Sequence, residues 1–218
     1  MHIPDGVLTS QVWAPLAVVS AAAVSISARA ARRRLADSSI PFVGVVGAFV
    51  FALQMLNFPL VAVGAAATGG ISDHIVGAGL LAIAFGPSIA ILSMSAIVLI
   101  QCAFGDGGIA ALGANIFDMG VLSTLTAYFV YATMKKRLPT AGAVAGTFAG
   151  VMAGAAGAAI WVMLSQPYGE KFFLAMLATH AASGAVEAAV TVAVLRTLAA
   201  WGLSPGRAIG ATNAATNA

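Results

Sequence analysis

Residues 141–165 read AGAVAGTFAGVMAGAAGAAIWVMLS, an apolar stretch without a charged side chain. An α-helix rises about 1.5 Å per residue, so roughly 20 apolar residues cross the hydrocarbon core of a bilayer, which is about 30 Å thick. Six further apolar segments lie near residues 12–30, 40–63, 74–86, 88–104, 110–133 and 172–202. The sequence therefore predicts an all-α, polytopic membrane protein with about seven transmembrane helices.

The composition excludes the soluble classes of protein. Apolar residues make up 61% of the 218 positions and charged residues 8%, whereas about 25% charged residues is usual in soluble domains. A mean hydropathy of +0.99 excludes a soluble enzyme, a disordered chain and a nucleic-acid binder. The single cysteine, Cys102, lies within an apolar run and provides neither a disulfide nor a metal cluster. We expect one domain, 1–218, in the lipid bilayer of the cell (inner) membrane.

The basic residues predict the orientation of the chain, because short cytoplasmic loops collect Lys and Arg. Seven crossings with the N-terminus outside and the C-terminus in the cytoplasm leave only Lys171 outside. The nine other basic residues then fall in three cytoplasmic clusters: Arg29, Arg32, Arg33 and Arg34; Lys135, Lys136 and Arg137; and Arg196 and Arg207. Residues 205–218 would form a cytoplasmic tail.

The first two residues hold the nitrogen donors of a compact chelate. The Met1 amine, the His2 backbone nitrogen and the His2 imidazole close adjacent five- and six-membered rings around one metal. His74, predicted on the same side of the membrane, is the available fourth nitrogen. Nitrogen-rich, square-planar coordination favours Ni(II) or Cu(II), with Co(II) near them in affinity. Binding should weaken as the pH falls, because the amine must be deprotonated and the imidazoles neutral.

The start of the chain also has simpler interpretations. MHIPDG, residues 1–6, carries no basic residue, and the arginines follow the first apolar run, so we expect no signal-peptide cleavage and retention of Met1. An unstructured N-terminus is an equally good interpretation of the same residues on chemistry alone. We nevertheless predict that residues 1–11 are a metal-chelating segment.

Polar residues surround the second histidine and the following loops. Ser72 or Asp73 is a natural N-cap for the helix expected next. Asp106 lies among glycines before Asn115, but no Walker lysine accompanies them, so a phosphate loop is excluded. Glu187 follows His180 by seven residues and shares its helical face, where a buried carboxylate needs a hydroxyl or an amide as its partner.

Four blocks together carry a resemblance to a known family. They are MHIPDG at 1–6, the glycine-rich segment with His74 that ends in FGP at 85–87, DGGIAALGANIFDMG at 106–120, and the His180–Glu187 pair. In order and spacing they resemble the substrate-binding S component of energy-coupling-factor transporters for nickel or cobalt, the CbiM/NikM type. Two positions differ from the family pattern: Asp118 replaces an expected asparagine, and Asp73 replaces a small residue.

The resemblance implies a seven-helix protein whose first residues fold back to hold nickel or cobalt. The implied ligands are the Met1 amine, the His2 backbone and side-chain nitrogens, and His74. Residues expected to line or support the site are Asp5, Ser72, Asp73, Asp106, Asn115, His180 and Glu187. The resemblance further implies no cofactor, a link to cobalamin biosynthesis, and several partners: a transmembrane coupling (T) subunit, two cytoplasmic ATPases and often a small accessory membrane protein.

Two other functions stay open at this point. A self-sufficient permease or channel would show repeated halves and polar residues on both sides of the midplane, and this chain shows few on the cytoplasmic side. An intramembrane enzyme could use His74, His180 and Glu187 as a zinc triad, although their spacing does not match the H-E-x-x-H pattern. The small residues Ala21 and Ser25 of the first segment serve equally well for docking a coupling subunit and for packing within the chain.

Overall fold

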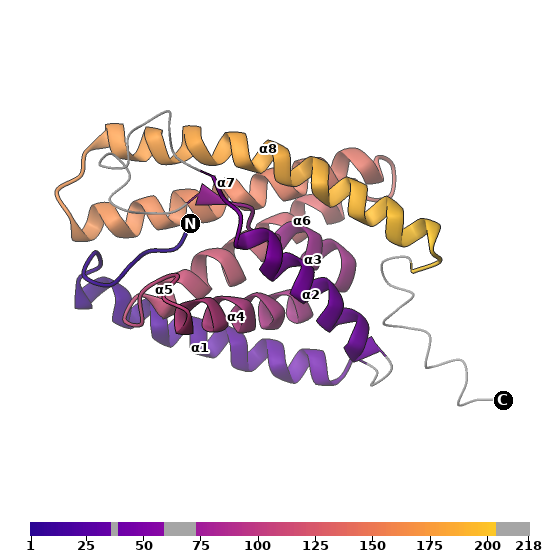
Figure 1. Ribbon diagram of the computed structural model, residues 1–218, viewed down its shortest axis with the longest axis horizontal. Helices are drawn as coiled ribbons and strands as arrows, with labels where there is room; N and C mark the ends of the chain where they lie inside the picture. The colour runs from indigo at the N-terminus through magenta and orange to yellow at the C-terminus, as the bar shows by residue number, and fades with distance from the viewer. Residues whose placement is uncertain (36–38, 59–72, 204–218) are drawn as a thin grey trace.

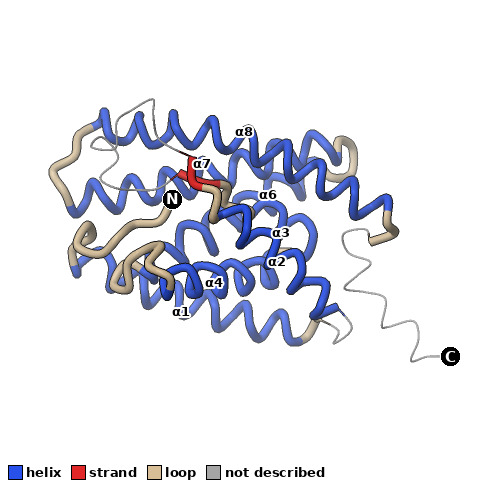
Figure 2. Tube along the Cα trace, in the orientation of Figure 1, coloured by secondary structure: helices blue, strands red, loops and turns tan. Residues whose placement is uncertain are grey.

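The structure is a computed structural model that describes residues 1–35, 39–58 and 73–203. Each of the seven predicted segments contains a helix. The helices are α1 (Ser10–Arg32), α2 (Ile40–Gln54), α3 (Ala78–Phe85), α4 (Pro87–Ala103), α5 (Leu112–Asn115), the π-helix η3 (Ile116–Leu122), α6 (Ser123–Met134), α7 (Pro139–Ser165) and α8 (Glu170–Ala200). The only strands in the described residues are β1 (Asn57–Phe58) and β2 (Asp73–His74). The predicted all-α class is confirmed (Figure 2).

Four helical segments are long and apolar enough to cross a membrane: α1, the continuous α5–η3–α6 segment, α7 and α8. The apolar helices α2 and α4 are shorter, and α3 has only eight residues. Because eight residues rise about 12 Å, α3 cannot cross the hydrocarbon core by itself. The chain is a multi-pass membrane protein, while seven crossings and the orientation remain predictions.

Helix α3 lies in the middle of the molecule rather than at its surface. All eight of its residues are buried, and it contacts α4, α6, α7 and α8. In Figure 1, α7 and α8 run along one long side and α1 along the opposite side, and the chain begins in the interior between them. The ends of α1, α6 and α8, which carry or precede the three basic clusters, lie at the same end of the molecule.

Two predicted boundaries were wrong near the start of α3. The second segment was expected to reach residue 63, but α2 ends at Gln54 and β1 follows. Pro59 favours extended backbone at Phe58 and removes a helical N–H, which explains the strand. The third segment was expected to begin at residue 74, yet Asp73 and His74 pair with β1 in an antiparallel register, Phe58 with Asp73 and Asn57 with His74.

The predicted N-cap of this helix was also wrong. Asp73 lies in β2, and Ser72 lies outside the described residues. The N-cap is Gly77, whose φ of 77° is left-handed and whose α-carbon faces the side chain of Val50. A Cβ at this position would clash with Val50, so only glycine fits.

A π-helix interrupts the long α5–η3–α6 segment. The backbone N–H of Ser123 donates to the Asp118 carbonyl five residues earlier, and the Ser123 hydroxyl donates to the same oxygen at 2.8 Å. Such single-turn π-bulges frequently occur at functional sites. The sequence pattern did not predict this turn.

Candidate metal centre

The first three residues lie inside the protein. Met1 and Ile3 are fully buried, and His2 is 3% exposed. The Ile3 backbone N–H donates to Asn115 Oδ1 at 2.8 Å, and Asn115 Nδ2 donates to the Ile3 carbonyl at 3.0 Å. The Gly108 backbone N–H donates to the same carbonyl at 3.0 Å. The α5 turn and the preceding loop therefore hold the N-terminus in place.

Asp5 secures the exit of this segment. Its carboxylate accepts the backbone N–H groups of Ile109 and Ala110 at 2.9 and 2.8 Å. Gly108 approaches Asp5 so closely that a Cβ there would overlap the carboxylate. Asp5 and Asn115 thus support the folded-back N-terminus from the same loop region.

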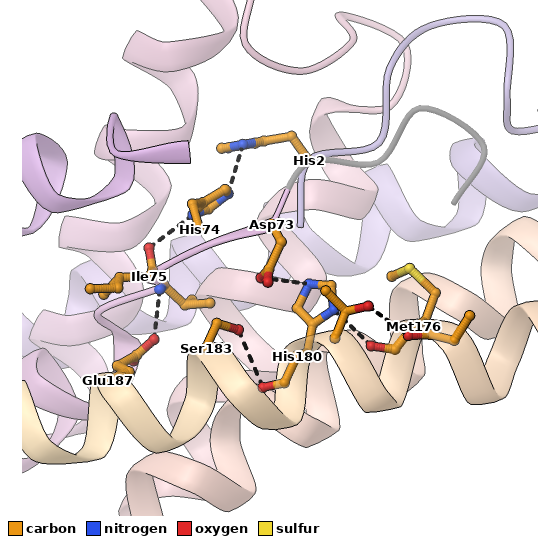
Figure 3. A network of polar contacts seen from close by, with 11 residues as sticks. His2, Asp73, His74, Ile75, Met176, His180, Ser183 and Glu187 are labelled. Carbon is orange, nitrogen blue, oxygen red and sulfur yellow. Dashed lines mark hydrogen bonds and ion pairs between the residues drawn. The ribbon is translucent and has the colours of Figure 1, made fainter. Parts of the chain in front are cut away.

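His2 and His74 meet face to face in the buried centre. His2 Nδ1 lies 3.1 Å from His74 Nε2, and the two rings stack with a centroid separation of 4.8 Å and an interplanar angle of 26° (Figure 3). His74 precedes α3 on strand β2, so the short β1–β2 pairing positions its ring. The structure brings together the two imidazoles that are 72 positions apart in sequence.

A backbone contact determines which nitrogen of His74 has a lone pair toward His2. His74 Nδ1 lies 2.8 Å from the Ile75 carbonyl, an oxygen that can only accept a hydrogen bond. Nδ1 of a neutral His74 ring therefore carries the proton, and Nε2 has its lone pair directed at His2. A partner on the second ring nitrogen is the usual way in which proteins orient a metal-binding histidine.

Two polar residues flank His2: Asp106, which follows α4, and Gln101, which lies within it. Asp106 Oδ1 lies 3.2 Å from His2 Nδ1. Gln101 lies beside His2 and is fully buried. The sequence reasoning missed Gln101, although an amide side chain within an apolar segment was a usable signal.

Asp73, His180 and Glu187 support the strand rather than the histidine pair. Asp73 Oδ1 lies 3.6 Å from His180 Nε2, and His180 Nδ1 lies 2.9 Å from the Met176 carbonyl. The Glu187 carboxylate accepts the backbone N–H groups of Val76 at 2.6 Å and Gly77 at 2.9 Å. The expected partner of Glu187 is thus a pair of backbone amides. These contacts attach the β2–α3 connection to α8.

The electrostatics leave the donor nitrogens neutral near pH 7. Burial lowers the pKa of the Met1 amine to about 5, although three nearby carboxylates partly oppose this effect. Burial also lowers the pKa of His2, although the hydrogen bond that His2 donates to Asp106 opposes this effect, and burial lowers the pKa of His74 well below its usual value. Neutral groups can bind a metal without a net loss of protons. In the metal-free protein His2 Nδ1 faces the His74 lone pair and the Asp106 carboxylate, so it carries the ring proton, which must move to Nε2 before Nδ1 can bind a metal.

The described residues contain no group of three or more His, Cys, Asp or Glu side chains arranged to hold a metal ion. His2 and His74 supply two imidazoles at this point. His180 and Glu187 have their own partners and do not join His74 in a three-residue zinc cluster.

Comparisons with known proteins agree with this fold. Residues 2–202 match the CbiM family, described as "Cobalt uptake substrate-specific transmembrane region". A protein of Haloquadratum walsbyi named for metal transport is 36% identical over 204 residues, covering 92% of this chain and 90% of that protein. The fused nickel transport protein NikMN of Rhodobacter capsulatus is 37% identical over 148 residues, which are 67% of this chain and 39% of that protein.

A solved structure shows the same architecture. The crystal structure of a truncated transition metal transporter matches with a TM-score of 0.84 and 30% identity, covering 92% of this chain and 99% of the other. Fold and sequence together define a multi-pass membrane protein of transition-metal transport. The chain belongs to the CbiM family and is a component of a cobalt or nickel uptake transporter. The resemblance inferred from the four sequence blocks is confirmed.

Proposed function

We propose that this chain is the substrate-binding S component of an ATP-driven energy-coupling-factor transporter, and that it captures nickel or cobalt in a square-planar nitrogen site. The four donors are the Met1 amine, the His2 backbone nitrogen, His2 Nδ1 and His74 Nε2. The observation that carries this proposal is the 3.1 Å approach of His2 Nδ1 to His74 Nε2 in a buried pocket. The nickel or cobalt ion is the transported substrate of this protein, not a resident cofactor.

The geometry of the histidine pair fits this ligand set. Two nitrogens bound at right angles, each about 2 Å from a metal, are separated by about 2.8 Å, close to the observed 3.1 Å. Nδ1 is also the His2 nitrogen that closes a six-membered ring with the His2 backbone nitrogen. Both requirements therefore fall on the same atom, His2 Nδ1.

The number of protons released on binding tests the state of the amine. With an amine pKa of about 5 and neutral imidazoles, binding at pH 7 to 8 should release about one proton, from the His2 backbone N–H. An exposed amine with its usual pKa near 8.0 would be protonated at pH 7, so metal binding would release about one additional proton. Below pH 5 the buried amine is protonated before binding, so the affinity should fall more steeply with each pH unit.

Calorimetry in buffers of different ionisation enthalpy counts these protons. Release of two protons at pH 7 would contradict a neutral, buried amine. Release of none would contradict coordination by the backbone nitrogen. The control is the same titration with an amine-acetylated chain, which should show weak binding and no such release.

The proposed partners are a transmembrane coupling subunit, two cytoplasmic ATPases and a small accessory membrane protein. Support comes from the fused relative, since the matched region covers only 39% of that protein. The small residues Ala21 and Ser25 on α1 are exposed, which favours their use in docking over packing within the chain. ATP hydrolysis is assigned to the partners.

Reconstituted transport tests this proposal against a self-sufficient permease. Proteoliposomes with this chain alone should accumulate radioactive nickel or cobalt slowly and without stimulation by ATP. Addition of the coupling subunit and ATPases should make uptake fast and ATP-dependent, and competition between equal amounts of the two metals identifies the preferred one. Rapid uptake by the isolated chain along a proton or sodium gradient would overturn the proposal.

A further inference from the structure

The side chain of Met1 occupies a fully buried position against helix α7. Its exposed fraction is 0%, and it belongs to the main hydrophobic core together with Met119 and Ala155. Gly154 of α7 lies close to this side chain: a Cβ placed on this glycine would lie 3.0 Å from Met1 Sδ. Such a separation is too short for ordinary van der Waals contact, so the methionine uses the space that the missing Cβ leaves free.

The π-turn also packs against Gly154. The same Cβ on Gly154 would lie 3.1 Å from the Asp118 carbonyl and would overlap the Ser123 hydroxyl that donates to it. One turn further along α7, a Cβ on Gly157 would lie 2.6 Å from Asp118 Oδ1. Two glycines on one face of α7 therefore allow the π-turn to pack close to α7, and the Met1 side chain lies beside the first of them.

A tryptophan on α7 fixes the position of this π-turn. Trp161 Nε1 donates to Asp118 Oδ1 at 2.8 Å, and the Asp118 side chain is 1% exposed. The carbonyl of the same residue accepts the Ser123 hydroxyl and the Ser123 backbone N–H. With both its side chain and its carbonyl held, Asp118 gives the pocket a defined shape.

We propose that Gly154 is a positioning residue, and that it forms with the π-turn at Asp118 a socket that recognises the side chain of the N-terminal methionine. This inference rests on the proposed function, because the seated side chain and the metal-binding amine share the Met1 α-carbon. Anchoring the side chain restricts the amine before metal binds and reduces the entropy lost in forming the chelate. The N-terminal residue then contributes through its shape as well as through its amine.

A chain that begins with alanine separates the socket from the chelate. Cleavage of an N-terminal fusion that leaves no extra residue yields Met1→Ala, which keeps all four proposed nitrogen donors. We expect nickel affinity, measured by calorimetry, to fall roughly 10- to 100-fold, the range typical of groups that position a metal ligand. Met1→Leu refills the pocket with a side chain of similar size and should recover most of this loss.

Gly154→Ala tests the socket from the other side. It should weaken nickel binding by roughly the same 10- to 100-fold in the Met1 chain, but add little in the Met1→Ala chain, because the two residues are then coupled. Gly150→Ala is the matched control, since its Cβ would meet the Ser123 carbonyl and Ala127 without reaching Met1. Its thermal stability should fall, whereas nickel affinity per folded molecule should not.

The outcomes distinguish the socket from the proposed function. Failure of the unaltered chain to bind nickel or cobalt would reject the proposed function. Strong binding by the unaltered chain with equal affinity in Met1→Ala would reject the socket alone. An effect of Gly154→Ala that persists fully in the Met1→Ala chain would also reject the socket, because the substitution would then act through Ser123. Loss in both single variants, with recovery by leucine, supports it.

Discussion

Adding one residue before Met1, or acetylating its amine, should abolish high-affinity binding of nickel or cobalt while the helical fold is retained. Acetylation removes the lone pair that the amine would donate. An additional residue moves the terminus away and must also fit where Met1 has no exposed surface. We expect the affinity to fall by more than about 100-fold, because loss of a direct ligand exceeds the 10- to 100-fold typical of a supporting group.

Calorimetry on the purified protein measures this loss, and thermal unfolding reports whether the fold survives. The same single residue added at the C-terminus is the matched control and should leave binding unchanged. An acetylated chain that binds nickel as tightly as the unmodified one would remove the amine from the ligand set. If the extended chain loses both nickel binding and its thermal transition, the acetylated chain decides the question, because acetylation adds fewer atoms to the buried terminus.

His74→Ala should cause a second loss of similar size. His74 Nε2 is the only imidazole nitrogen that faces His2 Nδ1 in the described residues, and its removal leaves three donors from one end of the chain. His180→Ala is the matched control, since it removes an equally buried histidine that contacts Asp73 instead. Its effect should stay within roughly 10- to 100-fold, because it acts only through β2.

Competition with a coloured chelator measures both affinities in one experiment. His2→Ala should resemble His74→Ala, because it removes the other ring. Greater damage from His180→Ala than from His74→Ala would exchange the roles of the two residues. Equal and small effects of all three variants would place the metal elsewhere.

The helices could be predicted from sequence because they depend on local composition. Long apolar runs and the positions of basic residues identified every helical segment, including the one at 139–165. The errors came from contacts between distant residues. Nothing near residues 73–78 reveals that strand β1 will pair there, or that Glu187 will accept the Val76 and Gly77 amides from another helix.

The candidate site was also predictable only where it depends on residues adjacent in sequence. The chelate of Met1 and His2 is encoded in two adjacent residues, so elementary chemistry was sufficient to suggest it. The hydrogen bond that fixes the His74 tautomer and the burial that lowers the pKa of the amine depend on the assembled fold. Gln101 beside His2 and the π-turn at Asp118 likewise became visible only once α4 and α7 had been placed.

X-ray absorption spectroscopy of the nickel-loaded protein tests the central claim most directly. We expect four nitrogen ligands in one plane, with scattering from two imidazole rings and no fifth or sixth ligand. Acetylation of the amine should eliminate this spectrum. A six-coordinate spectrum dominated by oxygen would rule out the nitrogen site, because it would assign the metal to carboxylates such as Asp73 and Asp106 instead of the N-terminal nitrogens.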